Sequence, residues 1–153
     1  MTGTTAPAAG AEVSALQAAL AAEHAAVYGY GVVGAHLTGA ALAAATSDWV
    51  AHQVARDSLE AMLRSSGTQP VAAAVAYRIP HPVRNSAGAM SLAVTLEDRV
   101  ATAYLGLVAL PATAIRELGA RGVVAAAVRA ASWRGKTVAF PGFVAGALSP
   151  ARR

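Results

Sequence analysis

The chain lacks cysteine altogether, and it is poor in aromatic and charged residues. Its 153 residues contain no Cys, 5% aromatic residues and 13% charged residues. Without cysteine there can be no disulfide framework, no thiolate nucleophile and no zinc site with cysteine ligands. The length is sufficient to bury a hydrophobic core without such staples, so we expect packing alone to hold the fold together.

Alternating runs of β-branched residues are also missing, and alanine dominates the apolar residues. The chain is 56% hydrophobic, and alanine combines the highest helix propensity with little bulk. Helices rich in small residues can approach each other closely, whereas nothing in the chain has the alternation expected of a sheet. Composition and length therefore predict a single all-α domain.

A signal peptide and a convincing membrane span are absent too. Residues 1–10 lack a cationic and an apolar region and are expected to form a disordered leader, which favours a cytoplasmic location. Residues 25–45 have no formal charge apart from the titratable His36, and about 20 apolar residues suffice to cross a bilayer. However, Ala, Gly and Thr make this segment only weakly lipophilic, and no Lys/Arg cluster flanks it. We expect no membrane association.

Basic charge collects in the last quarter of the chain. Such an end could bind nucleic acid or another anionic surface. It has no interleaved aromatic residues and no recognised nucleic-acid motif, so a solvated helix face followed by a basic tail at 144–153 is the preferred interpretation. The basic residues are Arg116, Arg121, Arg129, Arg134, Lys136, Arg152 and Arg153, with Glu117 as their acidic neighbour.

Helical periodicity divides the chain into four segments. We expect the first helix to begin near Ala11 and to end in the high thirties or mid-forties, and the second to run from 46–48 to 65–67. The third is expected over 89–110 and the fourth from 120–123 to Gly135. The proline-containing connection over 68–87 is long for a compact domain, but its length fits the crossover of ferritin-like bundles. The predicted fold is a ferritin-like up-down four-helix bundle over 11–143, with a long crossover between helices 2 and 3.

One polar pair recurs on the apolar stripes of two of these helices. Glu23 and Tyr30 lie two helical turns apart in the first, and Glu97 and Tyr104 repeat the same residues at the same spacing in the third. A carboxylate on the core stripe of each of two helices is the layout of a ferritin-type bundle. The repeat therefore indicates two related helical hairpins.

The other two helices do not complete a di-metal site. Such a site needs Glu-x-x-His from each of two helices, but the residues three positions before the histidines are Ala21, Val33, Trp49 and Arg78. The stripes instead contain His52, Arg56 and Arg129. The guanidinium groups of the two arginines fit a carboxylate. We therefore expect no metal cofactor, and a buried polar network made of Glu23, Tyr30, His52, Arg56, Glu97, Tyr104 and Arg129.

Alternatives remain open at this level. An atypical Fe or Mn site could use Glu23, His52 and Glu97 with Asp57 or Glu60, which would make the protein an oxidase or a metal store. Arg56 could instead reach solvent and pair with Glu60, and His52 could be a simple core histidine. No nucleophile elbow and no glycine-rich phosphate loop is present. An enzymatic function is therefore not favoured.

Several longer motifs resemble the DUF4439 family of ferritin-like domains. They are LQAALAAEHAAVYGY at 16–30, LEDRVATAY at 96–104, Trp133-Arg134 and Phe140-Pro141-Gly142. The resemblance covers nearly the whole chain after residue 10. It implies a ferritin-like four-helix bundle that often self-associates, in a family whose biochemical role is not established. We expect a scaffold or interaction module that forms a homodimer through an alanine- and glycine-rich face.

Overall fold

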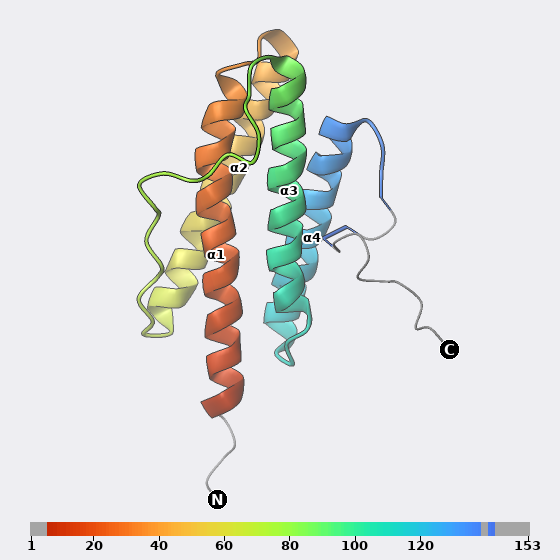
Figure 1. Ribbon diagram of the computed structural model, residues 1–153. Coiled ribbons are helices and arrows are strands. Elements are labelled where there is room, and N and C mark those ends of the chain that lie inside the picture. The colour runs from red at the N-terminus through yellow and green to blue at the C-terminus, as the bar shows by residue number, and fades with distance from the viewer. Residues whose placement is uncertain (1–5, 139–140, 143–153) are drawn as a thin grey trace, which may run out of the picture.

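Four long helices make up the fold. The computed structural model describes residues 6–138 and 141–142, and within this part of the chain every regular element is helical (Figure 1). This confirms the predicted all-α class and the number of helices. The helices are α1 (Ala6–Gly34), α2 (Gly39–Ser65), α3 (Ser86–Val108) and α4 (Thr113–Arg134).

The helices lie side by side with alternating directions and one long return. In Figure 1, α1 and α4 run toward the same end of the molecule, and α2 and α3 run the opposite way. Residues 66–85 lead from the end of α2 back along the helices to the start of α3. α1 packs against both α2 and α3, and α3 packs closely against α4, but α2 and α4 approach each other much less closely. The bundle therefore has one open side, between α2 and α4.

The helix boundaries differ from the predicted ones at two turns. The first break falls between Gly34 and Gly39, where Gly39 has φ of 57°, a conformation that glycine adopts without steric cost. The predicted start of the second helix at 46–48 is thus wrong, because the alanine-rich run before it is already part of α2. The fourth helix likewise begins at Thr113 rather than at 120–123, and α1 begins at Ala6, inside the expected leader.

The long connection is tied to α1 by side chains. Gln17 donates from Nε2 to the carbonyl of Gln69 at 2.7 Å and accepts from the amide of Val71 at 2.7 Å. His24 Nε2 lies 3.0 Å from the carbonyl of Val71 and donates to it. These bonds satisfy backbone groups that have no partner in regular structure, so they explain why the segment follows α1.

Two apolar clusters form the core, and polar residues lie between the same helices. One cluster contains Leu20, Leu59 and Leu107, and the other contains Val33 and Leu92. Glu23, His24, His52 and Glu97 are nevertheless buried. Among the described residues, no helix has the length and hydropathy needed to cross a bilayer.

Candidate functional site: a buried polar network

Each of the four helices contributes to a polar network at the centre of the bundle. Residues four or seven positions apart share one face of a helix, so a polar pair on each helix can point to the same place. Glu23, His52 and Glu97 are at most 1% exposed there. The contributors are Glu23 and Tyr30 from α1, Asp48 and His52 from α2, Glu97 and Tyr104 from α3, and Arg129 and Trp133 from α4.

His52 bridges the two glutamates. Its Nδ1 lies 2.6 Å from Oε2 of Glu23 and its Nε2 lies 2.9 Å from Oε1 of Glu97. Burial by itself would lower the pKa of His52, but the hydrogen bonds to both carboxylates and their charges raise this pKa to about 9. Since an ionised carboxylate can only accept, both ring nitrogens donate and the ring is an imidazolium at neutral pH. His52 is therefore the cation that joins α1, α2 and α3.

Glu97 receives donors from three other helices. Its Oε1 accepts from Tyr30 Oη at 2.6 Å, from His52 Nε2 at 2.9 Å and from Arg129 Nε at 3.0 Å. Burial would raise the pKa of Glu97, but His52, Arg129 and Tyr30 lower it overall, so the carboxylate is ionised. Its other oxygen, Oε2, is buried and has no hydrogen-bond partner among the described residues.

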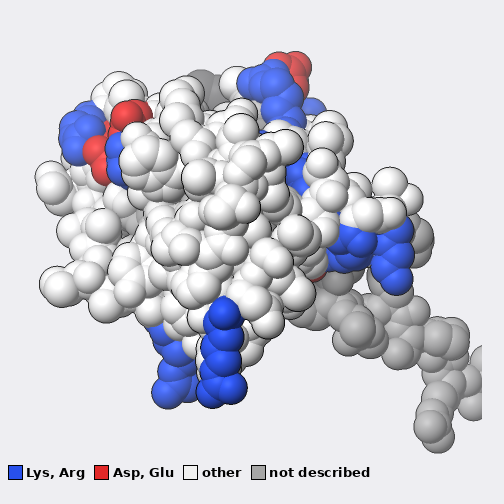
Figure 2. Space-filling view, turned by 90° about the horizontal axis from the view of Figure 1, so that it is seen from above, with Lys and Arg blue, Asp and Glu red and all other residues white. Residues whose placement is uncertain are grey.

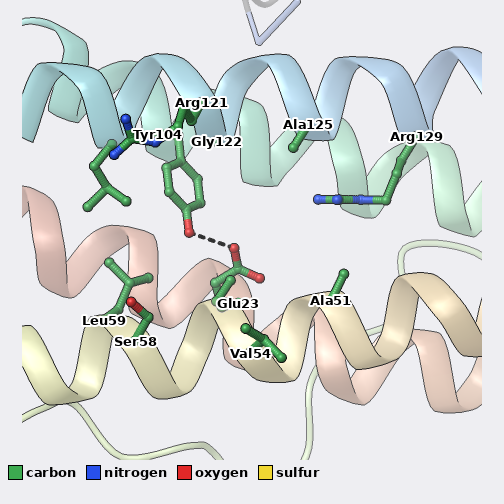
Figure 3. A pocket seen from close by; sticks show the side chains of 12 residues that line it. Glu23, Ala51, Val54, Ser58, Leu59, Tyr104, Arg121, Gly122, Ala125 and Arg129 are labelled. Atoms are coloured by element: carbon green, nitrogen blue, oxygen red, sulfur yellow. Dashed lines mark hydrogen bonds between the residues drawn. The ribbon is translucent and has the colours of Figure 1, made fainter.

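Tyr104 completes the second half of the network. Its hydroxyl donates to Oε1 of Glu23 at 2.8 Å, as Figure 3 shows. Burial and the neighbouring carboxylates raise the pKa of both Tyr30 and Tyr104, so each tyrosine remains a neutral donor. Gly122 of α4 faces the ring of Tyr104, and a Cβ at this position would overlap the ring. The close approach of α4 therefore depends on this glycine.

Two members of the network were not expected from the sequence. Trp133 Nε1 lies 2.8 Å from Oδ2 of Asp48 and 3.0 Å from Oη of Tyr30. Burial raises the pKa of Asp48, although the hydrogen bond from Trp133 acts against this shift. Helical periodicity places Asp48 at the expected start of the second helix, and Trp133 enters only through the Trp133-Arg134 motif of the family resemblance. The sequence feature that points to them is their spacing, because Asp48 lies one helical turn before His52 and Trp133 lies one turn after Arg129.

Arg56 does not join the network, so its inclusion among the expected members is wrong. Its Nε donates to Oδ1 of Asp57 at 2.8 Å, and its side chain is 27% exposed. The physical reason lies in the packing of α2, whose buried residues are only Ala45, His52, Leu59 and Leu63. Because α2 lies along the open side, its buried stripe is narrow and Arg56 falls outside it.

The three residues considered as metal ligands, Glu23, His52 and Glu97, do lie together. Their atoms are already bonded to one another, and a metal would require His52 to give up a proton and one of its carboxylate partners. Within residues 6–138 and 141–142, no group of three or more His, Asp or Glu side chains is arranged to hold a metal ion. Asp57 and Glu60 pair instead with Arg56 and Arg64.

The network is reached from the open side of the bundle. A cavity of about 310 Å³ between α2 and α4 is lined by Glu23, Val54, Tyr104, Arg121 and Arg129, together with Ser58 and apolar residues (Figure 3). A second cavity of about 410 Å³ lies further along the same side. Arg129 lines both cavities, and its Nε donates to Glu97.

The basic end of the chain is largely paired where the structure describes it. Arg129 bonds to Glu97, and Arg134 lies 2.6 Å from Asp98 on α3. Figure 2 shows a mostly uncharged surface at one end of the molecule, on which the visible acidic side chains lie beside basic ones. Two more of the basic residues considered for nucleic-acid binding, Arg152 and Arg153, lie outside the described residues.

The class defined by these observations is a four-helix protein with an internal ion-pair network. Residues 15–145 match the model of the domain of unknown function DUF4439, and the chain belongs to this family. The chain is also similar to the crystal structure of a conserved hypothetical protein, rv2844, from Mycobacterium tuberculosis. The two share 32% identity with a TM-score of 0.79, over 82% of this chain and 96% of that one. A comparison with curated proteins gave no match.

Proposed function

We propose that the protein is a ferritin-like scaffold whose centre is closed by its own ion pairs and whose open side binds a protein partner. The single observation that carries this proposal is the position of His52 between Glu23 and Glu97, with both ring nitrogens engaged. In a di-metal bundle these carboxylates would face metal ions. Here the side-chain cations of His52 and Arg129 take that role.

The path of the chain supports the ferritin-like assignment. Two antiparallel helix pairs are joined by a connection that returns along the bundle (Figure 1). In an up-down bundle with short loops the second and third helices would be antiparallel, whereas a long crossover makes them parallel. The similarity to the mycobacterial structure covers most of both chains and is compatible with this topology.

The network sets the register of the helices rather than adding much stability. Desolvation of buried charges offsets most of their attraction, so a buried ion-pair cluster is weak evidence for net stability. Shifting one helix along its axis by a turn, about 5.4 Å, would break every bond to that helix. We infer that the cluster selects one alignment of the helices and thereby holds the outer surface in a fixed shape.

The outer surface that this alignment presents is apolar along the open side. Large apolar side chains are exposed there, among them Val54 on α2 and Val128 on α4. Monomeric proteins rarely expose large contiguous apolar patches, and such patches often mark sites of association. This side is therefore the binding surface of the proposed scaffold.

Metal analysis tests the closed centre. The full chain is purified without chelator, and Fe, Mn and Zn are measured per chain by inductively coupled plasma mass spectrometry. We expect far less than one metal per chain, with no difference between the native protein and Glu23→Gln. About two Fe or Mn per chain in the native protein, lost in Glu23→Gln, would overturn the proposal.

One observation favours the second candidate, a metal-binding bundle. Oε2 of Glu97 is a buried acceptor without a partner in the described residues, and buried acceptors usually have one. A metal in this place would draw both oxygens of Glu97 and deprotonate His52. The same metal analysis separates the two candidates, because only this one predicts stoichiometric metal that is lost in Glu23→Gln.

A further inference from the structure

The second cavity on the open side lies directly beside the polar network, and we name it the Asp48 cavity. Its volume of about 410 Å³ falls within the range of small-molecule sites, about 300 to 1,000 Å³. The residues that line it include Ser47 and Asp48 from α2, and Val128, Arg129, Ser132 and Trp133 from α4.

The network beside this cavity is short of one positive charge. Among the described residues it contains three carboxyl groups, those of Glu23, Asp48 and Glu97, and two cationic groups, those of His52 and Arg129. His52 bonds to both glutamates and Arg129 bonds to Glu97, so neither cation is bonded to Asp48. A partly buried charge without a partner is unfavourable, and one monovalent cation beside Asp48 would balance the network.

One oxygen of Asp48 is available for such a cation. Oδ2 accepts from Trp133 Nε1 at 2.8 Å. Tyr30 Oη lies 3.3 Å from the same oxygen, but a hydroxyl has one proton and the 2.6 Å bond to Glu97 uses it. Within the part of the chain that the structure describes, Oδ1 has no hydrogen-bond partner and Asp48 forms no ion pair. The cavity is therefore in contact with a carboxylate whose acceptor capacity is not used.

Arg129 lines the Asp48 cavity without supplying this cation. Its Nε donates to Glu97, and Figure 3 shows its guanidinium group directed toward the level of Ala125, which precedes it on α4. Ser132 and Trp133 follow Arg129 on the helix, so the terminal nitrogens point away from them. The wall that Arg129 adds to the Asp48 cavity is mainly its aliphatic chain.

We propose that the Asp48 cavity binds the ammonium group of a primary alkylamine. An ammonium group has three N–H donors and no acceptor, and the cavity offers three acceptors, which are Oδ1 of Asp48 and the hydroxyls of Ser47 and Ser132. The indole of Trp133 is the aromatic ring that attracts cations most strongly. Val128 and the aliphatic chain of Arg129 provide an apolar wall for the alkyl chain.

A metal ion fits the same place less well. Hard cations bind several oxygen ligands at once, whereas Asp48 is the single carboxylate that lines this cavity. Among residues 6–138 and 141–142, no group of three or more His, Asp or Glu is arranged to hold a metal ion. The mixture of one carboxylate, two hydroxyls and apolar surface is suited to an organic cation.

Two indole signals report on the site and on an internal control. The chain contains two tryptophans; Trp133 lines the cavity, whereas Trp49 donates to the carbonyl of Val27 and does not line it. The ¹⁵N-labelled full chain is titrated with n-butylammonium chloride at constant ionic strength, and Trp133→Phe assigns the signals. We expect a saturable shift of the Trp133 signal alone. Equal shifts of both signals, or none up to about 100 mM, far above the millimolar affinity of a weak site, would overturn the inference.

Two further probes test the chemistry of the ligand. Butan-1-ol has the same alkyl chain without a charge, and tetramethylammonium has the charge without N–H donors. We expect each to bind at least about tenfold more weakly than n-butylammonium, because charge-assisted hydrogen bonds are the strong ones. Equal binding of either probe would overturn the assignment of a primary ammonium group.

Substitutions locate the binding in the Asp48 cavity. Asp48→Asn should raise the dissociation constant of n-butylammonium at least about tenfold, whereas Asp57→Asn, the other aspartate of α2, should leave it unchanged. Ser47→Ala combined with Ser132→Ala changes only exposed side chains and should raise the constant at least about threefold. Ser58→Ala, in the other cavity, is the control for this pair. Native affinity in Asp48→Asn or in the double serine variant would overturn the inference.

The inference rests on the metal-free centre of the proposed function, because a metal ion there would supply the missing positive charge. Metal content measured on the same preparation distinguishes the two. Metal-free protein that does not bind n-butylammonium overturns the ammonium site and leaves the closed centre intact. Stoichiometric metal overturns the closed centre, and the count of charges with it.

Discussion

The packed and the open sides of this molecule differ in how many neighbours each helix has. α3 lies against both α1 and α4 and buries nine residues, among them Glu97 and Tyr104. α2 is longer but packs closely only on α1, and it buries four. A helix with two neighbours has a wide buried stripe, and a helix with one has a narrow stripe. The same inward spacing therefore buries Glu97 on α3 and leaves Arg56 near solvent on α2.

The largest expected effect comes from removing a charge of the packed side. Glu97→Gln leaves His52 and Arg129 without their shared carboxylate, and breaking a buried ion pair costs about 3 to 5 kcal/mol. We expect a loss of this size in the free energy of unfolding, measured by urea denaturation at pH 7. Combined with Arg129→Met, the loss should be smaller than the sum of the two single losses.

Arg56→Met is the control for this comparison. Because Arg56 bonds only to an exposed aspartate, its removal should change the free energy of unfolding by no more than about 0.5 kcal/mol. Equal losses for Arg56→Met and Arg129→Met would show that the two sides do not differ as the contacts indicate.

The second effect is a dependence of stability on pH through His52. Its pKa in the folded chain is about 9, against about 6.5 for an unperturbed histidine, so the folded state holds this proton more tightly. The resulting stabilisation is fully present below about pH 6.5 and is lost as the pH rises through 9. This difference between the folded and unfolded pKa of His52 corresponds to a change on the order of 3 kcal/mol in the free energy of unfolding.

Thermal unfolding from pH 6 to 10 measures this change. His52→Gln should remove it, whereas His36→Gln should not, because His36 bonds to a backbone carbonyl rather than to a carboxylate. The lowered pKa of Glu97 has the opposite sign: its contribution is present above its unfolded value and is lost as the pH falls through its lower folded value. An unchanged slope in His52→Gln would contradict the bridging role of the ring.

The smallest effect concerns how closely α4 approaches α3. Gly122→Ala places a Cβ against the ring of Tyr104, and overpacking typically costs about 1 to 3 kcal/mol. The matched control is Gly106→Ala on α3, where a Cβ meets no atom within 4 Å. The control should gain up to about 1 kcal/mol from helix propensity. Thermal unfolding should therefore shift in opposite directions for these two substitutions.

The repeated Glu and Tyr pair shows how much of the site was accessible from sequence. Glu23, Tyr30, Glu97, Tyr104, His52 and Arg129 were all expected in a buried network, because heptad spacing alone places them on apolar stripes, and hydrogen bonds join all of them. Arg56 shares such a stripe but lies outside the network. Spacing gives the direction of a side chain from its helix, but not whether a neighbouring helix lies in that direction.

The turns show the same limit for the fold. Helical periodicity does not locate the break between Gly34 and Gly39, because alanine continues the helical pattern on both sides and only the positive φ of Gly39 marks the turn. The pattern therefore places Asp48 at a helix start, although this residue lies well inside α2 and accepts from Trp133 of α4. A local pattern contains no information about which distant residue completes a hydrogen bond.

The sequence by itself determined that the chain forms four helices with carboxylates, tyrosines and a histidine on their inner stripes, because propensity and periodicity are local properties. Only the tertiary structure decided that His52 bridges two glutamates, that Arg129 rather than Arg56 pairs with Glu97, and that the side between α2 and α4 is open. These features depend on which helices are neighbours and how closely they approach. That choice is made by packing over the whole molecule, through contacts such as Gly122 against Tyr104.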